Sequence, residues 1–162
     1  MIILRRIATG ITSHMPSRAS EWTLAAILLN WGLNVAMTPG YLDREYWTTL
    51  RDLLPSEPFS PVVFWGGGAI VVAALRLLAL VINGTFATTA WSRYSPHVRM
   101  LMATFSCFFW MTQVLSVWTA EQFWTGLSAS AFLLLLDFYN IARTSTDARH
   151  SDEAHRNGIA GT

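Results

Sequence analysis

The chain has 162 residues, of which 52% are hydrophobic and 13% charged, and its formal net charge is +1. A charged share near half of the usual ~25% is typical of a membrane protein that crosses the bilayer several times, and the length corresponds to one domain. No basic face stands out, so nucleic acid is not expected as a partner. The single cysteine, Cys107, excludes an intrachain disulfide.

Residues 1–20 are predicted to form a cytoplasmic segment that lies on the membrane. The apolar run MIIL is too short for a secretory signal, and Arg5 and Arg6 follow it instead of preceding it. Four aliphatic residues fall on one helical stripe beside these arginines, which predicts an interfacial helix attracted to anionic lipid, with Pro16 at its end. The stripe consists of Ile3, Leu4, Ile7 and Ile11.

A membrane domain is predicted over residues 21–143, and its first span covers about residues 22–38. Ser17 or Ser20 is expected to cap this helix. Asn30 and Asn34 lie four residues apart and share a helix face. Because amides in lipid hydrogen-bond to other helices, we expect both to join helices, in preference to forming a ligand site.

The connection after this span is predicted to form a surface helix over about residues 41–54. Its apolar residues recur at helical spacing and charged residues fill the opposite face, which is the pattern of an amphipathic helix lying on the membrane. Pro39-Gly40 and Pro55 bracket the segment. The apolar stripe consists of Leu42, Tyr46, Leu50, Leu53 and Leu54.

The second span is predicted at residues 61–83, PVVFWGGGAIVVAALRLLALVIN. It exceeds the ~20 apolar residues that a helix needs to cross ~30 Å of hydrocarbon. Gly66, Gly67 and Gly68 would let a neighbouring helix approach closely; a flexible hinge is the alternative. Arg76 is its only charge, and a charge at a span centre costs ~2.5–3.5 kcal/mol. Arg76 therefore needs a partner, a route to the interface or a function.

The third and fourth spans are predicted at about residues 97–118 and 122–143. Gln113 is the one interior amide of the third span, which is otherwise bulky and aromatic and has no histidine pair for haem. No cofactor is expected. The fourth span contains Asp137. Residues 144–162 are polar and are expected to form a frayed cytoplasmic tail.

The distribution of arginine predicts the orientation. Two arginines lie in the connections 39–60 and 119–121, and eight lie in the segments on the other side of the membrane. This bias places both termini in the cytoplasm, and we expect the protein in the bacterial inner membrane. The eight are Arg5, Arg6, Arg18, Arg93, Arg99, Arg143, Arg149 and Arg156.

This topology brings two opposite charges to the same depth. Arg76 lies about 10 Å from the inner end of its span and Asp137 about 9 Å from the inner end of its own, at the helical rise. We therefore predict a structural Arg76–Asp137 ion pair inside the membrane that joins the second and fourth spans. A proton or ion relay is the functional alternative, and it would need further acidic residues in the spans.

Motifs for catalysis or metal binding are missing from the sequence. It has no His-Glu-x-x-His motif and no glycine-rich phosphate loop. His150 and His155 lie near Asp152 and Glu153 in the tail, but tails of this composition are usually solvated. We expect no metal and no enzymatic activity.

Several stretches resemble a group of small membrane proteins that tailed bacteriophages and prophages of Gram-negative bacteria encode, whose function is not established. They are RRIATGITSHMPSRASEW, LRLLALVING, SPHVRMLMATFSCFFW and LLLLDFYNIARTSTDAR. The segment 39–60 and the turn near 119–124 depart from this pattern. The resemblance implies a phage-encoded membrane protein and carries over no site residue.

Together these inferences predict an all-α bundle of four transmembrane helices with one or two interfacial helices. Three functional classes remain open. The first is a non-enzymatic protein of the host inner membrane that acts on a second copy of itself or on another phage or host membrane protein. The second is a holin-like protein that permeabilises the membrane. The third is a small transporter or channel subunit.

Overall fold

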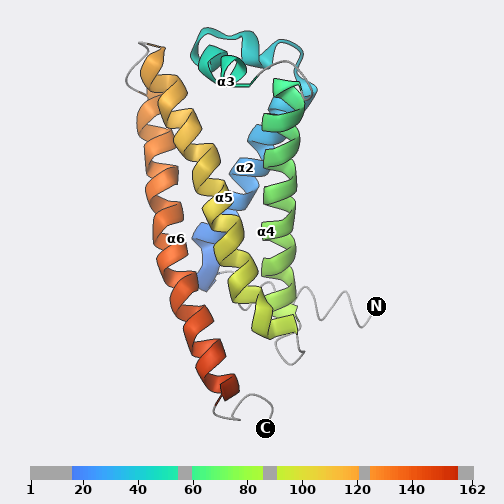
Figure 1. The fold of residues 1–162 in the computed structure, drawn as a ribbon, viewed down its shortest axis with the longest axis vertical. Helices are drawn as coiled ribbons and strands as arrows, with labels where there is room; N and C mark the ends of the chain where they lie inside the picture. Colours follow the sequence, from blue (N-terminus) through green and yellow to red (C-terminus); the bar gives the residue numbers. More distant parts are fainter. Residues whose placement is uncertain (1–15, 55–59, 86–90, 121–124, 157–162) are drawn as a thin grey trace.

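The computed structural model is a bundle of four long helices closed at one end by a cap of short helices (Figure 1). It describes residues 16–54, 60–85, 91–120 and 125–156. Every element described there is helical, which confirms the all-α prediction. The long helices are α2 (Ala19–Met37), α4 (Gly68–Thr85), α5 (Trp91–Thr119) and α6 (Thr125–Arg156). A 3-10 turn, η1 (Pro16–Arg18), precedes α2, and a π-helical turn, η4 (Val63–Gly67), precedes α4.

Two helical stretches of the described chain, Val63–Ile82 and Tyr94–Thr119, are long and apolar enough to cross a membrane. They correspond to the second and third predicted spans. The bundle also exposes large apolar side chains along its length. Among them are Ile27, Leu33, Leu78, Phe105, Phe132, Leu135 and Phe138.

The prediction of one surface helix over 41–54 is wrong. The segment forms two 3-10 turns, η2 (Tyr41–Asp43) and η3 (Glu45–Trp47), and a short helix, α3 (Thr48–Asp52). Gly40 has a φ of 68°, in the left-handed region that glycine adopts without a steric cost. Arg44 is extended, with φ −67° and ψ 142°. Gly40 turns the chain just before the segment, and Arg44 interrupts the path of a continuous helix within it.

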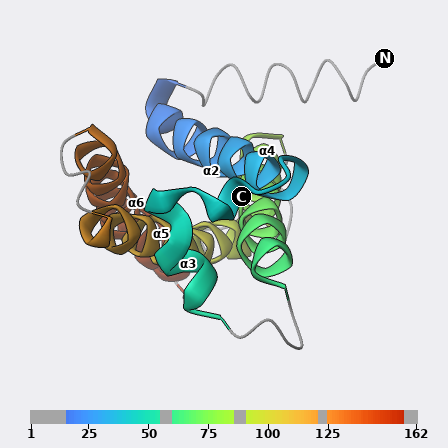
Figure 2. The same cartoon turned by 90° about the horizontal axis from the view of Figure 1, so that it is seen from above.

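Contacts with the bundle explain why the interrupted path is stable. The indole Nε1 of Trp65 donates to the carbonyl of Leu50 over 2.7 Å, and the Ser116 hydroxyl donates to the carbonyl of Tyr46 over 2.8 Å. Both are backbone acceptors whose satisfaction a folded protein requires. Leu50 and Trp47 are buried against the bundle. The segment is therefore a cap over one end of the bundle (Figure 2).

The prediction of a frayed tail from residue 144 onward is wrong as far as Arg156. Helix α6 continues without a break to Arg156. Thr144 and Ala148 are buried, and His97 Nε2 lies 3.4 Å from Asp152 Oδ2. Tertiary contacts therefore stabilise the first turns of a segment whose composition alone predicts fraying.

The beginning of α2 differs from prediction as well. The N-cap residue is Arg18, without a side-chain cap hydrogen bond. Ser20, an expected cap, lies inside α2 and donates to Asn140 Oδ1 over 2.8 Å. The predicted interfacial helix before Pro16 lies outside the described residues.

The glycine triplet forms a packing notch at two of its three positions. A Cβ atom on Gly66 would lie 3.1 Å from the backbone nitrogen of Ala36 in α2, and one on Gly68 would lie 3.2 Å from the ring of Phe109. A Cβ atom on Gly67 would meet nothing within 4 Å. The two helices approach this closely because Gly32 of α2 also lacks a side chain: a Cβ atom on Gly32 would lie 3.0 Å from the Gly66 carbonyl oxygen.

Candidate functional site: two buried ion clusters and a cleft

Polar residues line the interior of the bundle at intervals of seven. Residues seven apart lie on nearly the same helix face, because two turns of an α-helix cover 7.2 residues and the drift is only about 20°. One such series on α5 and one on α6 face the packed interior, and all six side chains are buried. They are Arg99, Ser106 and Gln113 on α5, and Ser130, Asp137 and Thr144 on α6.

The central ion cluster contains the pair that the sequence analysis selected. Arg76 Nη2 lies 2.6 Å from Asp137 Oδ1, and the two side chains are 1% and 0% exposed. Arg76 Nη1 donates to the Ser106 hydroxyl over 3.1 Å, and Trp110 Nε1 donates to Asp137 Oδ2 over 2.8 Å. Two helices thus supply the charges and α5 supplies the neutral partners. The cluster joins α4, α5 and α6.

A second ion cluster lies nearer the chain termini. Arg99 donates to both carboxylate oxygens of Glu21, from Nε over 2.8 Å and from Nη2 over 2.5 Å, a bidentate geometry that is among the strongest ion contacts. Its Nη1 also lies 3.4 Å from Asp147 Oδ2. Burial lowers the pKa of Arg18, the charge of Arg99 acts in the same direction, and Glu21 and Asp147 oppose both. The ion contacts of Arg99 with Glu21 and Asp147 therefore join α2, α5 and α6.

The sequence analysis missed this second cluster. It counted Arg99 among the arginines on the cytoplasmic side, placed Asp147 within the polar tail and assigned Glu21 no partner. The interval of seven was the available signal, because it places Arg99 on the same face as Ser106 and Gln113. The carboxylates that pair with Arg99 come from helices far away in the sequence, so no local pattern identifies them.

Between the clusters, α2 and α6 are joined by Asn140, which is fully buried. Its Oδ1 accepts from the Ser20 hydroxyl, and its carbonyl accepts from the Thr144 hydroxyl over 2.7 Å. Beyond this contact the two helices diverge toward the cap (Figures 1 and 2). Ring contacts of Trp31 and Trp47, 5.9 Å between centroids, fill part of the space under the cap.

A cleft of about 440 Å³ remains between α2, α5 and α6 below the cap. Gln113 and Trp110 of α5, Ser130 of α6 and Trp31 of α2 all line it. Trp110 is shared with the central ion cluster, since its indole N–H donates to Asp137. The ion pair therefore lies directly behind one wall of the cleft.

The predicted amides take different places around this cleft. Gln113 is buried, as expected for an interior amide, and its Nε2 has no hydrogen-bond partner among the described residues. Asn30 and Asn34 line the cleft with exposed side chains. Asn34 Nδ2 donates to the carbonyl of Asn30 over 2.7 Å, within its own helix. The expected role of these two asparagines in joining helices is therefore not what the structure shows.

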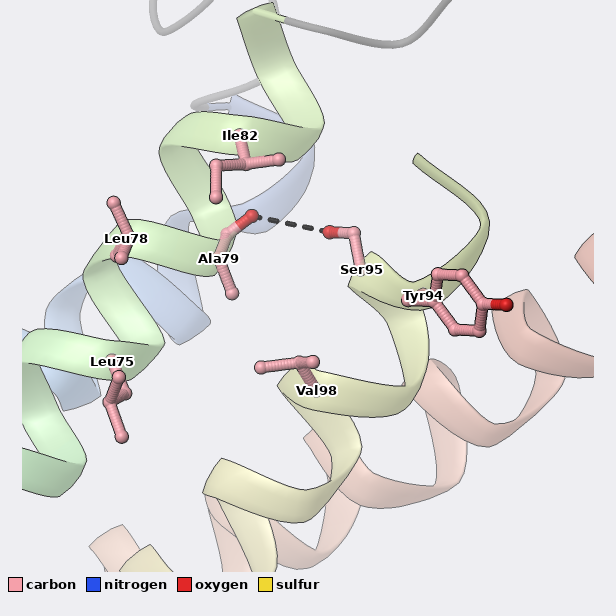
Figure 3. A pocket seen from close by; sticks show the side chains of 7 residues that line it. All are labelled: Leu75, Leu78, Ala79, Ile82, Tyr94, Ser95 and Val98. Carbon is pink, nitrogen blue, oxygen red and sulfur yellow. Dashed lines mark hydrogen bonds between the residues drawn. The ribbon is translucent and has the colours of Figure 1, made fainter. Parts of the chain in front are cut away.

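A smaller hollow of about 150 Å³ lies on the other side of the bundle, between α4 and α5 (Figure 3). Its lining is apolar, and the hydroxyl of Ser95 is already satisfied by donating to the carbonyl of Ala79 over 3.2 Å. It offers shape and dispersion contacts but no free polar group. The lining consists of Leu75, Leu78, Ala79, Ile82, Tyr94, Ser95 and Val98.

Within the described residues, no group of three or more metal-ligating side chains lies together. Of the tail residues considered for metal, His150 Nδ1 lies 4.0 Å from Glu153 Oε2, with both side chains exposed. The side chain of His155 lies outside the described residues.

No protein-family model matches this chain, and neither curated proteins nor solved structures include a significant match.

Proposed function

We propose that this chain is a non-enzymatic inner-membrane protein, encoded by a phage or prophage, that spans the membrane four times and acts by binding a partner in or beside the bilayer. The observation that carries the proposal is the reversal of polarity between interior and exterior. Arg76, Asp137 and Arg99 are at most 1% exposed, whereas Leu78 is 54% and Phe132 63% exposed. Large exposed apolar patches are unfavourable in water and mark contact with a membrane or partner.

Buried charges and exposed apolar side chains also support a membrane crossing by α2 and α6. Around the buried Asp137, α6 exposes Leu135 and Phe138, and α2 exposes Leu33 and, at the cleft, Ile27. Both helices bury their charges against the two helices that meet the criteria for a span. Since lipid cannot solvate an unpaired charge, charges on α2 and α6 that face inward and pair favour four crossings.

Cysteine labelling tests the number of spans. In a Cys107→Ala background, Leu53→Cys in the cap and His150→Cys near the end of α6 are treated with a membrane-impermeant maleimide on intact spheroplasts. With four spans, the two positions lie on opposite sides, so only Leu53→Cys is labelled before permeabilisation. If only α4 and α5 cross, the cap and both termini share one side of the membrane. Leu53→Cys and His150→Cys would then be labelled to the same extent, before and after permeabilisation. Equal labelling would overturn the four-span proposal.

Partner binding, and not leakage, is expected because the interior charges are paired between helices of one bundle and leave no charged face to line a pore. Tightly controlled expression in a Gram-negative host should leave the membrane potential intact and an impermeant dye excluded. Sudden depolarisation followed by dye entry would favour the holin-like alternative and contradict the proposal.

Photo-crosslinking then tests for the partner directly. A benzoyl-phenylalanine residue at Phe132 or Leu53, both exposed, should give a discrete adduct with a second copy or a host protein. Trp65 is a buried aromatic position and serves as the matched control that should give none. Adducts with lipid alone at both exposed positions would contradict partner binding.

A small transporter is the second candidate, and one observation favours it. The polar interior extends from Gln113 at the cleft through Asp137 and Asn140 to the cluster at Arg99, and Glu21 adds a second fully buried acid. In vesicles loaded with a pH-sensitive dye, a relay would carry protons after an acid jump and Asp137→Asn would stop it. A protein that only binds a partner would show no flux before or after the substitution.

A further inference from the structure

We infer that the cleft between α2, α5 and α6 binds an uncharged amphiphile whose polar end carries two or more acceptor oxygens, such as the carbonyls of a quinone or the esters of a diacylglycerol. This inference deepens the proposed function, since it names a ligand class for a protein that binds within the membrane. It rests on unsatisfied donors, the absence of charge, the aromatic wall and the access route.

Three buried N–H donors of residues that line the cleft have no partner among the described residues. They are Nε2 of Gln113, which is 5% exposed, and Nε1 of Trp31 and of Trp47, which are each 7% exposed. A buried donor without an acceptor is unfavourable, and a ligand oxygen that accepts from it removes that cost. All three unsatisfied atoms are donors, so the complementary ligand group is an acceptor.

The charge of the ligand follows from the lining. None of the described residues that line the cleft carries a formal charge. The nearest buried charges, Arg76 and Asp137, neutralise each other over 2.6 Å behind Trp110. A cationic ligand would meet no acid in the cleft, and an anionic one would meet no base. A neutral polar end is therefore the complementary choice.

The shape and access of the cleft favour an amphiphile. Its volume of about 440 Å³ lies in the range of small-molecule sites. Trp31, Trp47 and Trp110 supply aromatic surface, and the N–H of Trp110 is already committed to Asp137. Ile27 of α2 and Leu133 of α6 also line the cleft. Because α2 and α6 diverge here, an apolar tail can leave between them toward lipid (Figure 1).

Tryptophan fluorescence provides the assay. The full chain is placed in nanodiscs of an ether-linked phosphatidylcholine, which contributes no ester carbonyl oxygens, and is titrated with decylubiquinone, a quencher. Dioctanoylglycerol is tested by competition, and decylbenzene, which has the tail and ring without acceptors, is the ligand control. We expect saturable quenching by decylubiquinone and no displacement of it by decylbenzene.

Gln113→Leu is the decisive variant. It removes one donor, keeps a similar volume and leaves all eight tryptophans in place, so quenching by quinone dissolved in the lipid is unchanged. We expect about tenfold weaker binding, the effect of one net hydrogen bond. Folding should be retained, because the substitution removes an unsatisfied buried amide. Thr104→Val, on the exposed face of α5, is the matched control and should bind like the wild type.

The outcomes separate the ligand sources and the two proposals. Displacement of decylubiquinone by dioctanoylglycerol shows that acceptor oxygens suffice, whereas saturable binding without that displacement assigns the site to a carbonyl-bearing ring. The inference would be overturned by quenching without saturation, by displacement with decylbenzene, or by unchanged binding in Gln113→Leu. Displacement by dodecyltrimethylammonium, a cationic amphiphile, would also overturn it. None of these results affects the membrane potential, so failure here is distinct from failure of the proposed function.

Discussion

Removal of one charge from the central pair should strongly destabilise the bundle. In Arg76→Gln, Asp137 keeps its charge at a site with no exposure, where Trp110 is the remaining donor among the described residues. Opposite charges about 4 Å apart attract by about 4 kcal/mol at an effective dielectric constant of about 20. Removing one member of a buried pair typically costs about 3–5 kcal/mol. We expect a loss of that size for Arg76→Gln and for Asp137→Asn.

The double variant tests the origin of this loss. Arg76→Gln combined with Asp137→Asn leaves no unpaired charge, so its free energy of unfolding should exceed that of either single variant. Arg51→Gln is the matched control. Its partner Asp43 lies at 3.2 Å, but the two side chains are 43% and 65% exposed, so the cost should be at most about 1 kcal/mol.

Unfolding by added SDS in mixed micelles, followed by tryptophan fluorescence, measures these differences as shifts of the transition midpoint. Single-variant losses no larger than that of Arg51→Gln would refute the reasoning. Additivity of the two single losses in the double variant would refute it as well, since it would show that the two charges do not interact.

Three further outcomes can be measured on the same material. Arg99→Gln leaves the buried Glu21 without its bidentate partner and beside Asp147, so it should lower the free energy of unfolding by about 3–5 kcal/mol. Adding Glu21→Gln should recover part of this loss, and no recovery would contradict the pairing. Gly66→Ala should cost about 1–3 kcal/mol by overpacking the α2–α4 contact, whereas Gly67→Ala should stay within about 0.5 kcal/mol because its Cβ meets open space. Burial raises the pKa of Tyr41 above its usual 10.0, and the nearby phenol of the cap adds to the shift. The absorbance of its phenol should therefore titrate above pH 10. Because the unfolded chain loses that proton first, this contribution to stability is present below pH 10 and is lost as pH rises through the folded pKa. A titration midpoint at or below 10 would contradict the burial of Tyr41.

Properties that depend on distance along one helix were open to prediction from the sequence. The apolar length of residues 61–83 and 97–118 identifies two helices that the structure also finds long and apolar enough to cross a membrane. The rise of ~1.5 Å per residue converts sequence position into depth. The matching depths were enough to predict the Arg76–Asp137 ion pair, in which Arg76 Nη2 lies 2.6 Å from Asp137 Oδ1.

Properties that depend on which helix lies beside which were decided only by the tertiary structure. Arg99 pairs with Glu21 and Asp147 because the beginning of α2 and the last part of α6 both come close to the beginning of α5. The cap does not form the continuous amphipathic helix that its sequence predicts. Trp65 and Ser116 of the bundle instead donate hydrogen bonds to its backbone carbonyls at Leu50 and Tyr46. The cleft exists because α2 and α6 diverge beyond Asn140, and the tilt between two helices is set by packing across their whole interface, which no single stretch of sequence encodes.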